Sequence, residues 1–314
     1  MKRRDFLRKG TMFGAGSAFK QNLENLQAAL DSNAKLLQTK PDLVTVIGGE
    51  PVQMLNRALN ELGGIGAFVK NGQKVVIKPN IGWVRTPELA GNTNPLLIGE
   101  LVSKCLEAGA SKVTVFDYTC DPAWEKCYAS SGIEAAVKAA GGIIVPGNEE
   151  KYFTEVNLPR GIVLKKVKIH EALLDTDVWF NVPILKHHGG AKLTCAMKNY
   201  MGIIWDRQIF HSSDLQQCIA DVCTWTKKPI LNIIDAYRVL SQNGPQGRSE
   251  ADVSTVKALL ASPDIVAADT AALRFYNQEV KPLALNEVGH INKGESFMLG
   301  TTNLDKLDIK RIQL

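Results

Sequence analysis

The sequence is missing several features that would place it in a special class of protein. It has no run of about 18–20 apolar residues, the length a helix needs to cross a bilayer, so we predict no membrane span. Its six cysteines include no Cys-x-x-Cys pair and no ferredoxin-like run, so we expect no iron–sulfur cluster bound by its own cysteines. The net charge is only +5, and the lysines are scattered, which argues against nucleic acid as a partner.

The cysteines are explained most simply as free thiols. Four of them lie in segments that we predict as helices or helix starts, where a buried thiol packs as a small apolar side chain. Cys120 and Cys127 flank a short loop, and their spacing alone does not decide whether they pair in an oxidising compartment.

The first residues contain Arg3-Arg4 followed by Phe6-Leu7-Arg8, which resembles a twin-arginine export signal. The apolar stretch behind it is short and ends at Lys20, and no small-x-small cleavage site follows. We expect export to the periplasm by this route. The alternative is a basic, disordered tail on a cytoplasmic protein.

The remaining chain alternates between strand-like and helix-like patterns. Apolar runs predict strands over residues 43–47, 75–80, 112–117, 143–145, 178–185, 230–235, 256–261 and 307–312. Helical spacing and caps predict helices over residues 51–69, 95–108, 124–140, 213–226 and 264–276. This alternation predicts an α/β fold, a mainly parallel sheet with helices on both faces in three layers.

Two short segments break the alternation. Residues 161–164 and 167–169 are strand-like and have no helix between them, so we predict a short antiparallel excursion near 155–170. The predicted organisation is a tail and linker over residues 1–40 and a single α/β domain over 41–314. The sequence leaves undecided whether residues around 145–175 form a small subdomain.

The densest group of reactive side chains lies between Phe180 and Trp205. A buried strand leads into a polar turn with two glycines and then into a segment compatible with a helix. Three lysines and two histidines fall within the thirteen residues from Lys186 to Lys198.

Other polar side chains end the predicted strands. Open parallel sheets bind ligands at the carboxyl ends of their strands, so these residues are expected to meet at one edge. We predict catalytic roles for Lys186, His187, His188 and Lys198. We predict ligand binding by Lys78, Asn80, Gly189, Gly190, Lys192, Asn199 and Gly244, and metal binding by Asp117, Asp235 and His187.

The residue types suggest the chemistry. Lysines supply positive charge for a carboxylate or phosphate. Imidazole, with an unperturbed pKa of about 6.5, can move protons near neutral pH. Because neighbouring side chains on an extended strand point in opposite directions, one of His187 and His188 is expected to be structural. The aspartates could orient the imidazole or hold a divalent metal.

Several of these segments, in order, resemble the domain-of-unknown-function 362 family. They are 75–80, 181–187, 198–202, Asp235 with 243–247, and 261–269. The resemblance implies a site at these motifs and supplies no reaction. Some members of that family carry a fused ferredoxin-type domain, whose cysteine pattern this chain lacks. A looser similarity links Gly189-Gly190-Ala191-Lys192 to the nickel-pincer lactate racemases.

These observations favour an exported enzyme that acts on an anionic small molecule, with acid/base or redox chemistry unassigned. A divalent metal and a redox or enzyme partner are compatible with this interpretation. The alternative is a non-catalytic accessory protein that holds a metal, cofactor or anion. A third interpretation makes the basic cluster purely structural.

Overall fold

The computed structural model describes residues 40–314, and residues 41–314 form one compact unit. The predicted export signal lies outside the described residues. Twelve strands are present: β1 (Leu43–Ile47), β2 (Lys74–Pro79), β3 (Lys112–Val115), β4 (Ile143–Ile144), β5 (Phe153–Asn157), β6 (Lys166–His170), β7 (Val178–Val182), β8 (Ile184–His188), β9 (Lys192–Thr194), β10 (Leu231–Leu240), β11 (Val253–Ser262) and β12 (Ile309–Gln313).

Ten of these strands form one sheet in the order β12-β1-β11-β10-β7-β2-β3-β4, with β8 and β9 attached beside β10. The run from β10 to β4 is parallel throughout, and β12 pairs with β1 in parallel. Only β11 and the β8–β9 hairpin add antiparallel pairs. The mainly parallel sheet predicted from the sequence is confirmed.

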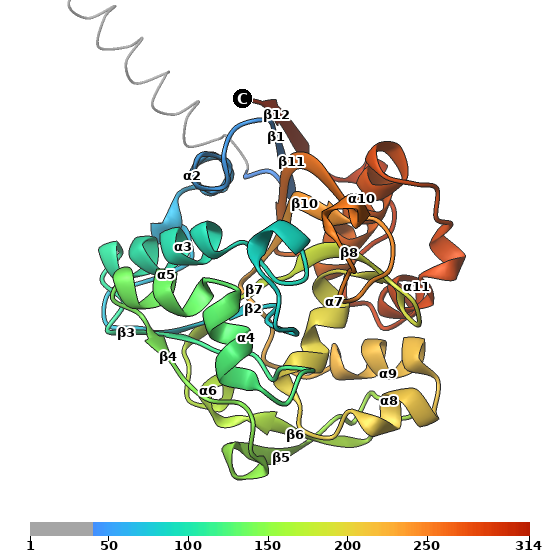
Figure 1. Ribbon diagram of the computed structural model, residues 1–314. Coiled ribbons are helices and arrows are strands. Elements are labelled where there is room, and N and C mark those ends of the chain that lie inside the picture. Colours follow the sequence, from blue (N-terminus) through green and yellow to red (C-terminus); the bar gives the residue numbers. More distant parts are fainter. Residues whose placement is uncertain (1–39) are drawn as a thin grey trace, which may run out of the picture. The chain divides into compact units, whose positions relative to one another are not determined.

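Helices cover both faces of the sheet (Figure 1). They are α2 (Pro51–Glu61), α3 (Pro95–Glu107), α4 (Trp124–Ser130), α5 (Ile133–Ala139), α6 (Glu171–Leu174), α7 (Ala196–Asn199), α8 (Gln208–Ser212), α9 (Leu215–Val222), α10 (Ile265–Glu279) and α11 (Gly289–Ser296). Helices α2 to α5 pack on one face, and α7, α9, α10 and α11 pack on the other. No helix among residues 40–314 has the length and apolar character to cross a membrane.

Strand periodicity sorts the side chains between the two faces. On β2, Val75 and Ile77 join the core beneath α2 to α5, whereas Val76 joins the core beneath α7 to α11. Successive side chains of a strand alternate between faces, so Lys78 shares the face of Val76. This parity decides which polar residues can meet.

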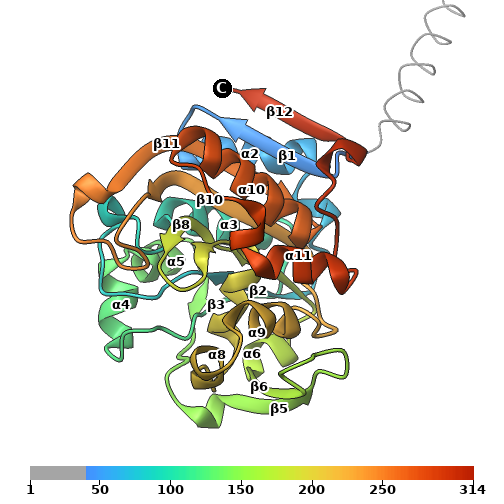
Figure 2. The same cartoon turned by 90° about the vertical axis from the view of Figure 1, so that its right-hand side faces the viewer.

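The antiparallel excursion is confirmed as the two-stranded sheet β5–β6, visible at the bottom of Figure 2. The predicted strand over residues 161–164 is wrong. The backbone N–H groups of Ile162, Val163 and Leu164 donate to the carboxylate of Asp221 and not to a neighbouring strand. A single buried carboxylate thus replaces a ladder of strand hydrogen bonds.

Other predicted bounds also differ from the structure. Helix α2 ends at Glu61 because Gly63 and Gly64 take positive φ angles of 96° and 78°. The helix predicted over 124–140 is interrupted at Gly132, where φ is 72°. Pro183 divides the strand predicted over 178–185 into β7 and β8.

Candidate functional site

A buried ion pair marks the carboxyl end of β2. The ammonium of Lys78 lies 2.7 Å from Asp117 Oδ1, and both side chains are at most 2% exposed. The contact is an ion pair between two buried side chains. Asp117 Oδ2 accepts a 2.6 Å hydrogen bond from the backbone N–H of Ile81. Burial raises the pKa of Asp117 and lowers that of Lys78, and the charge of each opposes the shift of the other.

A chain of asparagine side chains extends from this pair across the sheet. Lys78 donates to Asn199 Oδ1 at 2.8 Å, and Asn199 Nδ2 donates to Asn181 Oδ1 at 2.8 Å. Asn181 then donates to Asn232 at 2.9 Å, and Asn232 to the carbonyl of Ser262. A fully bonded buried network of this kind fixes the arrangement of the strands that carry it.

Lys186 on β8 is a second buried lysine, 2% exposed. Its ammonium donates to Asn80 Oδ1 at 2.9 Å and to the carbonyl of Gly91 at 2.5 Å. Neither acceptor carries a charge. Burial, followed by the positive charge of Lys198, lowers the pKa of Lys186 to about 7.

Lys198 comes from the short helix α7. The carboxylate of Asp269 holds that helix by accepting the N–H groups of Ala196 at 2.6 Å and Met197 at 3.0 Å. Lys198 has no hydrogen-bond partner within residues 40–314, and burial lowers its pKa to about 8. Its ammonium is therefore a group that titrates close to neutral pH.

The two adjacent histidines are both neutral near pH 7. His188 Nδ1 accepts the N–H of Ala191 at 3.0 Å, so its proton is on Nε2. Burial and then the charges of Lys198 and Lys186 lower the pKa of His188 to about 2. His187 Nδ1 accepts the N–H of Gly244 at 3.1 Å, and burial lowers its pKa as well. These shifts move both histidines away from titration near neutral pH, and their catalytic roles stay predictions.

Positive charge in the cluster exceeds negative charge. Lys186, Lys198 and Arg207 have no carboxylate partner within the described chain, whereas Lys78 has Asp117. Arg207 donates to the carbonyls of Tyr118 and Thr119 and lies 3.6 Å from Cys120 Sγ. We define the lysine cluster as Lys78, Lys186 and Lys198 with Asp117, and Arg207 borders it.

The structure brings together only part of the predicted site. Lys78, Asn80, Asp117, Lys186, Lys198 and Asn199 lie in or beside the lysine cluster. Gly189 and Gly190 lie on the exposed turn between β8 and β9, and Lys192, which is also exposed, is the first residue of β9. Gly244 packs against His187, where a Cβ atom would lie 1.9 Å from the His187 carbonyl oxygen.

Asp235 does not reach the cluster. It lies within β10, which continues to Leu240, and its parity places it on the α3 face. Both carboxylate oxygens accept backbone N–H groups, from Asn94 at 2.7 Å and Tyr237 at 3.0 Å. The three predicted metal ligands therefore lie apart, and residues 40–314 contain no group of three His, Cys, Asp or Glu side chains arranged to hold a metal.

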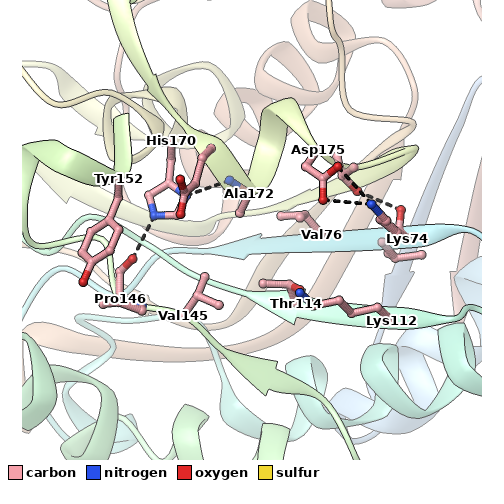
Figure 3. A pocket seen from close by; sticks show the side chains of 13 residues that line it. Lys74, Val76, Lys112, Thr114, Val145, Pro146, Tyr152, His170, Ala172 and Asp175 are labelled. Atoms are coloured by element: carbon pink, nitrogen blue, oxygen red, sulfur yellow. Dashed lines mark hydrogen bonds and ion pairs between the residues drawn. The ribbon is translucent and has the colours of Figure 1, made fainter. Parts of the chain in front are cut away.

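A separate cavity of about 350 Å³ lies at the opposite ends of the strands, beside Lys74 and Lys112 at the starts of β2 and β3 (Figure 3). His170 lines it, but both ring nitrogens are occupied. Nε2 contacts the Pro146 carbonyl at 2.8 Å and Nδ1 accepts from Ala172 at 3.1 Å. This histidine serves to connect segments of the chain.

Sequence reasoning assigned no role to four contributors: Asn181, Asn232, Asp269 and Arg207. The first three are polar residues inside apolar strands or an apolar helix, and a buried polar group needs a partner. That signal could have identified them. Cys120 is a free, exposed thiol and Cys127 a free, buried one, so no disulfide joins them.

Comparison with known proteins identifies the family. Residues 75–274, well over half of the chain, match the family described as "Domain of unknown function (DUF362)". The chain belongs to the DUF362 family. The matched range includes the whole lysine cluster, the asparagine network and Asp269.

Two known proteins are similar to this chain over most of its length. The thylakoid-associated protein sll1697 of Synechocystis sp. (strain PCC 6803) is 26% identical over 231 residues, covering 70% of this DUF362 chain and 68% of the relative. The lactate racemase apoprotein of Thermoanaerobacterium thermosaccharolyticum aligns with a TM-score of 0.42 and 12% identity. That alignment covers 76% of this chain and 58% of the racemase.

Gly202 tests the importance of the buried ion pair. A Cβ atom there would lie 1.9 Å from Asp117 Oδ1 and 2.6 Å from Lys78 Nζ. We expect Gly202→Ala to lower the free energy of unfolding by about 2–4 kcal/mol, because it overpacks the site and separates a buried pair. Denaturant unfolding measures the difference.

Gly66→Ala is the matched control, since a Cβ atom at that exposed glycine meets nothing within 4 Å. Equal stabilities of the Gly202 variant and the unmodified protein would contradict the importance of the pair.

Proposed function

We propose that this DUF362 protein is an enzyme that binds a small anionic molecule at the lysine cluster and transfers a proton with Lys198. One observation carries the proposal: the buried Lys186 and the half-buried Lys198 have no carboxylate partner within residues 40–314. A buried charge without a counter-ion is unfavourable, so the site favours an anion that supplies the missing negative charge.

The two lysines have different surroundings and therefore different proposed roles. Asn80 and the Gly91 carbonyl hold the Lys186 ammonium in one position, which suits an anchor for a carboxylate or phosphate. Lys198 has no such restraint, and its pKa of about 8 allows both protonation states near neutral pH. His188, neutral with its proton on Nε2, supplies a hydrogen-bond donor beside them.

A non-catalytic anion-binding protein is the second candidate, because the same uncompensated charges would retain an anion without turnover. Neither the enzyme nor the anion-binding protein proposed here uses a divalent metal, because Asp117 pairs with Lys78 and both oxygens of Asp235 accept backbone N–H groups. Elemental analysis of the purified protein tests for one directly.

Anion affinity should depend on pH. Sulfate keeps its charge across the range, so only the protein titrates. As pH rises from 6 to 9, through the pKa of about 7 for Lys186 and about 8 for Lys198, these groups lose their charge. We expect sulfate affinity, measured by calorimetry, to fall at least about tenfold.

Lys186→Met should weaken sulfate binding at pH 6 and flatten the pH dependence. Lys138→Met, on an exposed lysine of α5, controls for the loss of one charge. A sulfate affinity that is constant from pH 6 to 9 would argue against the lysine cluster as the anion site.

Proton transfer can be followed without knowing the product. We expect the protein in D₂O to incorporate deuterium at C3, next to the carbonyl, of one or more small 2-oxo acids, detected by NMR. Lys198→Met and Lys198→Arg should both reduce the rate by about 10²–10⁴-fold, because arginine keeps the charge but cannot lose its proton.

Two results would contradict the assignment of this protein as an enzyme. Exchange that persists in Lys198→Arg removes Lys198 as the proton carrier. Sulfate binding with no exchange for any acid in the panel favours the anion-binding protein.

We also propose export by the twin-arginine route, supported by Arg3-Arg4 and the Phe6-Leu7 that follow. Replacing both arginines with lysine keeps the charge and should retain the full chain in the cytoplasm of a bacterial host. Cell fractionation measures this, and an unchanged periplasmic fraction would refute the proposal.

A further inference from the structure

An open groove lies beside the lysine cluster, between the β5–β6 hairpin and α8. Its volume is about 580 Å³, within the range of small-molecule sites. Its walls include Tyr118, Val167, Trp205, Arg207 and Gln208. Lys166 and Lys168, which also line it, are each neutralised by a glutamate of the same groove, so they add little net charge.

Two stacked rings and a guanidinium lie together along one wall. The rings of Trp205 and Tyr118 are 5.0 Å apart and inclined by 15°, and the Arg207 guanidinium lies 3.8 Å from the centre of the Tyr118 ring. Hydrogen bonds to the carbonyls of Tyr118 and Thr119, at 3.0 and 2.7 Å, hold the guanidinium in this position. Within residues 40–314, no second ring covers it.

Arg207 also faces the lysine cluster. Its Nη1 lies 3.6 Å from Cys120 Sγ, and its charge contributes to the lowered pKa values of Lys78 and Lys198. The same side chain therefore borders the groove and the place where the anion binds. A ligand that reaches from the cluster into the groove passes over the guanidinium.

We propose that the groove holds the planar organic body of the anion, with its ring stacked on the Arg207 guanidinium that lines the groove. The inference rests on the proposed function and specifies its substrate class as an aryl or heteroaryl carboxylate or phosphate. A guanidinium attracts the π-face of a ring and also stacks on it through its own plane, which a saturated ring of similar size cannot reproduce.

Matched ligands test this directly. Calorimetry with the full chain compares inorganic phosphate, phenyl phosphate and cyclohexyl phosphate, and benzoate with cyclohexanecarboxylate repeats the comparison for a carboxylate. We expect each planar member to bind about 3–10-fold tighter than its saturated counterpart. Arg207→Lys keeps the charge and removes the plane, so it should bring this ratio close to one.

A second variant protects the test against misfolding of the first. Gln208→Trp changes an exposed residue on the groove wall and should fill part of the groove. It should weaken both organic phosphates relative to inorganic phosphate.

The outcomes separate the two proposals. Phosphate binding with planar-to-saturated ratios of one, in the unmodified protein, overturns the groove assignment alone. So does an unchanged ratio in a folded Arg207→Lys. No binding of any of these anions overturns the proposed function and the groove assignment together.

Discussion

The buried contact between Lys78 and Asp117 is the constraint on which the site depends. An ammonium held away from water needs acceptors in every direction, and the chain supplies them from three separate segments. Asp117 follows β3, Asn199 ends α7, and Gly202 leaves room for both charges. Moving any one of these segments would leave a buried charge uncompensated, so the pair restrains helix α7, which carries Lys198, and the loop after β3, which carries Cys120.

The protonation behaviour of the other residues in the cluster follows from its excess of positive over negative charge. Asp117 is occupied by Lys78, so Lys186 and Lys198 remain without a negative partner. Burial is the main cause of both low pKa values; the charge of Lys198 adds to it at Lys186, and the charges of Arg207 and Lys78 add to it at Lys198. Burial, and then the charges of Lys198 and Lys186, keep the adjacent His188 neutral far below pH 7. Lysines, which are usually permanent cations, become the titrating groups here, and histidine becomes a fixed donor.

The range that matches the DUF362 family contains this cluster. The family description names no reaction, so the chemistry has to be inferred from the residues. The chemistry they support is anion binding with a movable proton. Asp269 contributes without touching the cluster, because it holds the start of α7 and thereby orients Lys198. The stacked Arg207 adds a surface for the organic part of a ligand next to the charged part.

The sequence by itself determined the α/β architecture, because continuous apolar runs alternating with helical spacing leave few other ways to bury so much apolar surface. It also placed Lys78, Asn80, Lys186, Lys198 and Asn199 at one edge, since strand ends in a parallel sheet converge. It could not assign Asp235 correctly. The parity of β10 turns that carboxylate toward α3, where the backbone N–H of Asn94, far away in the sequence, donates to it.

The tertiary structure alone decided which charges are paired. Whether a lysine is neutralised depends on distances between residues far apart in the chain, as with Lys78 and Asp117, and its pKa depends on burial that no local pattern reports. Tertiary contacts also decided the state of residues 162–164, because their backbone N–H groups donate to Asp221 and not to a neighbouring strand. Local sequence sets what each segment favours, and long-range contacts decide which charges and donors remain available for a ligand.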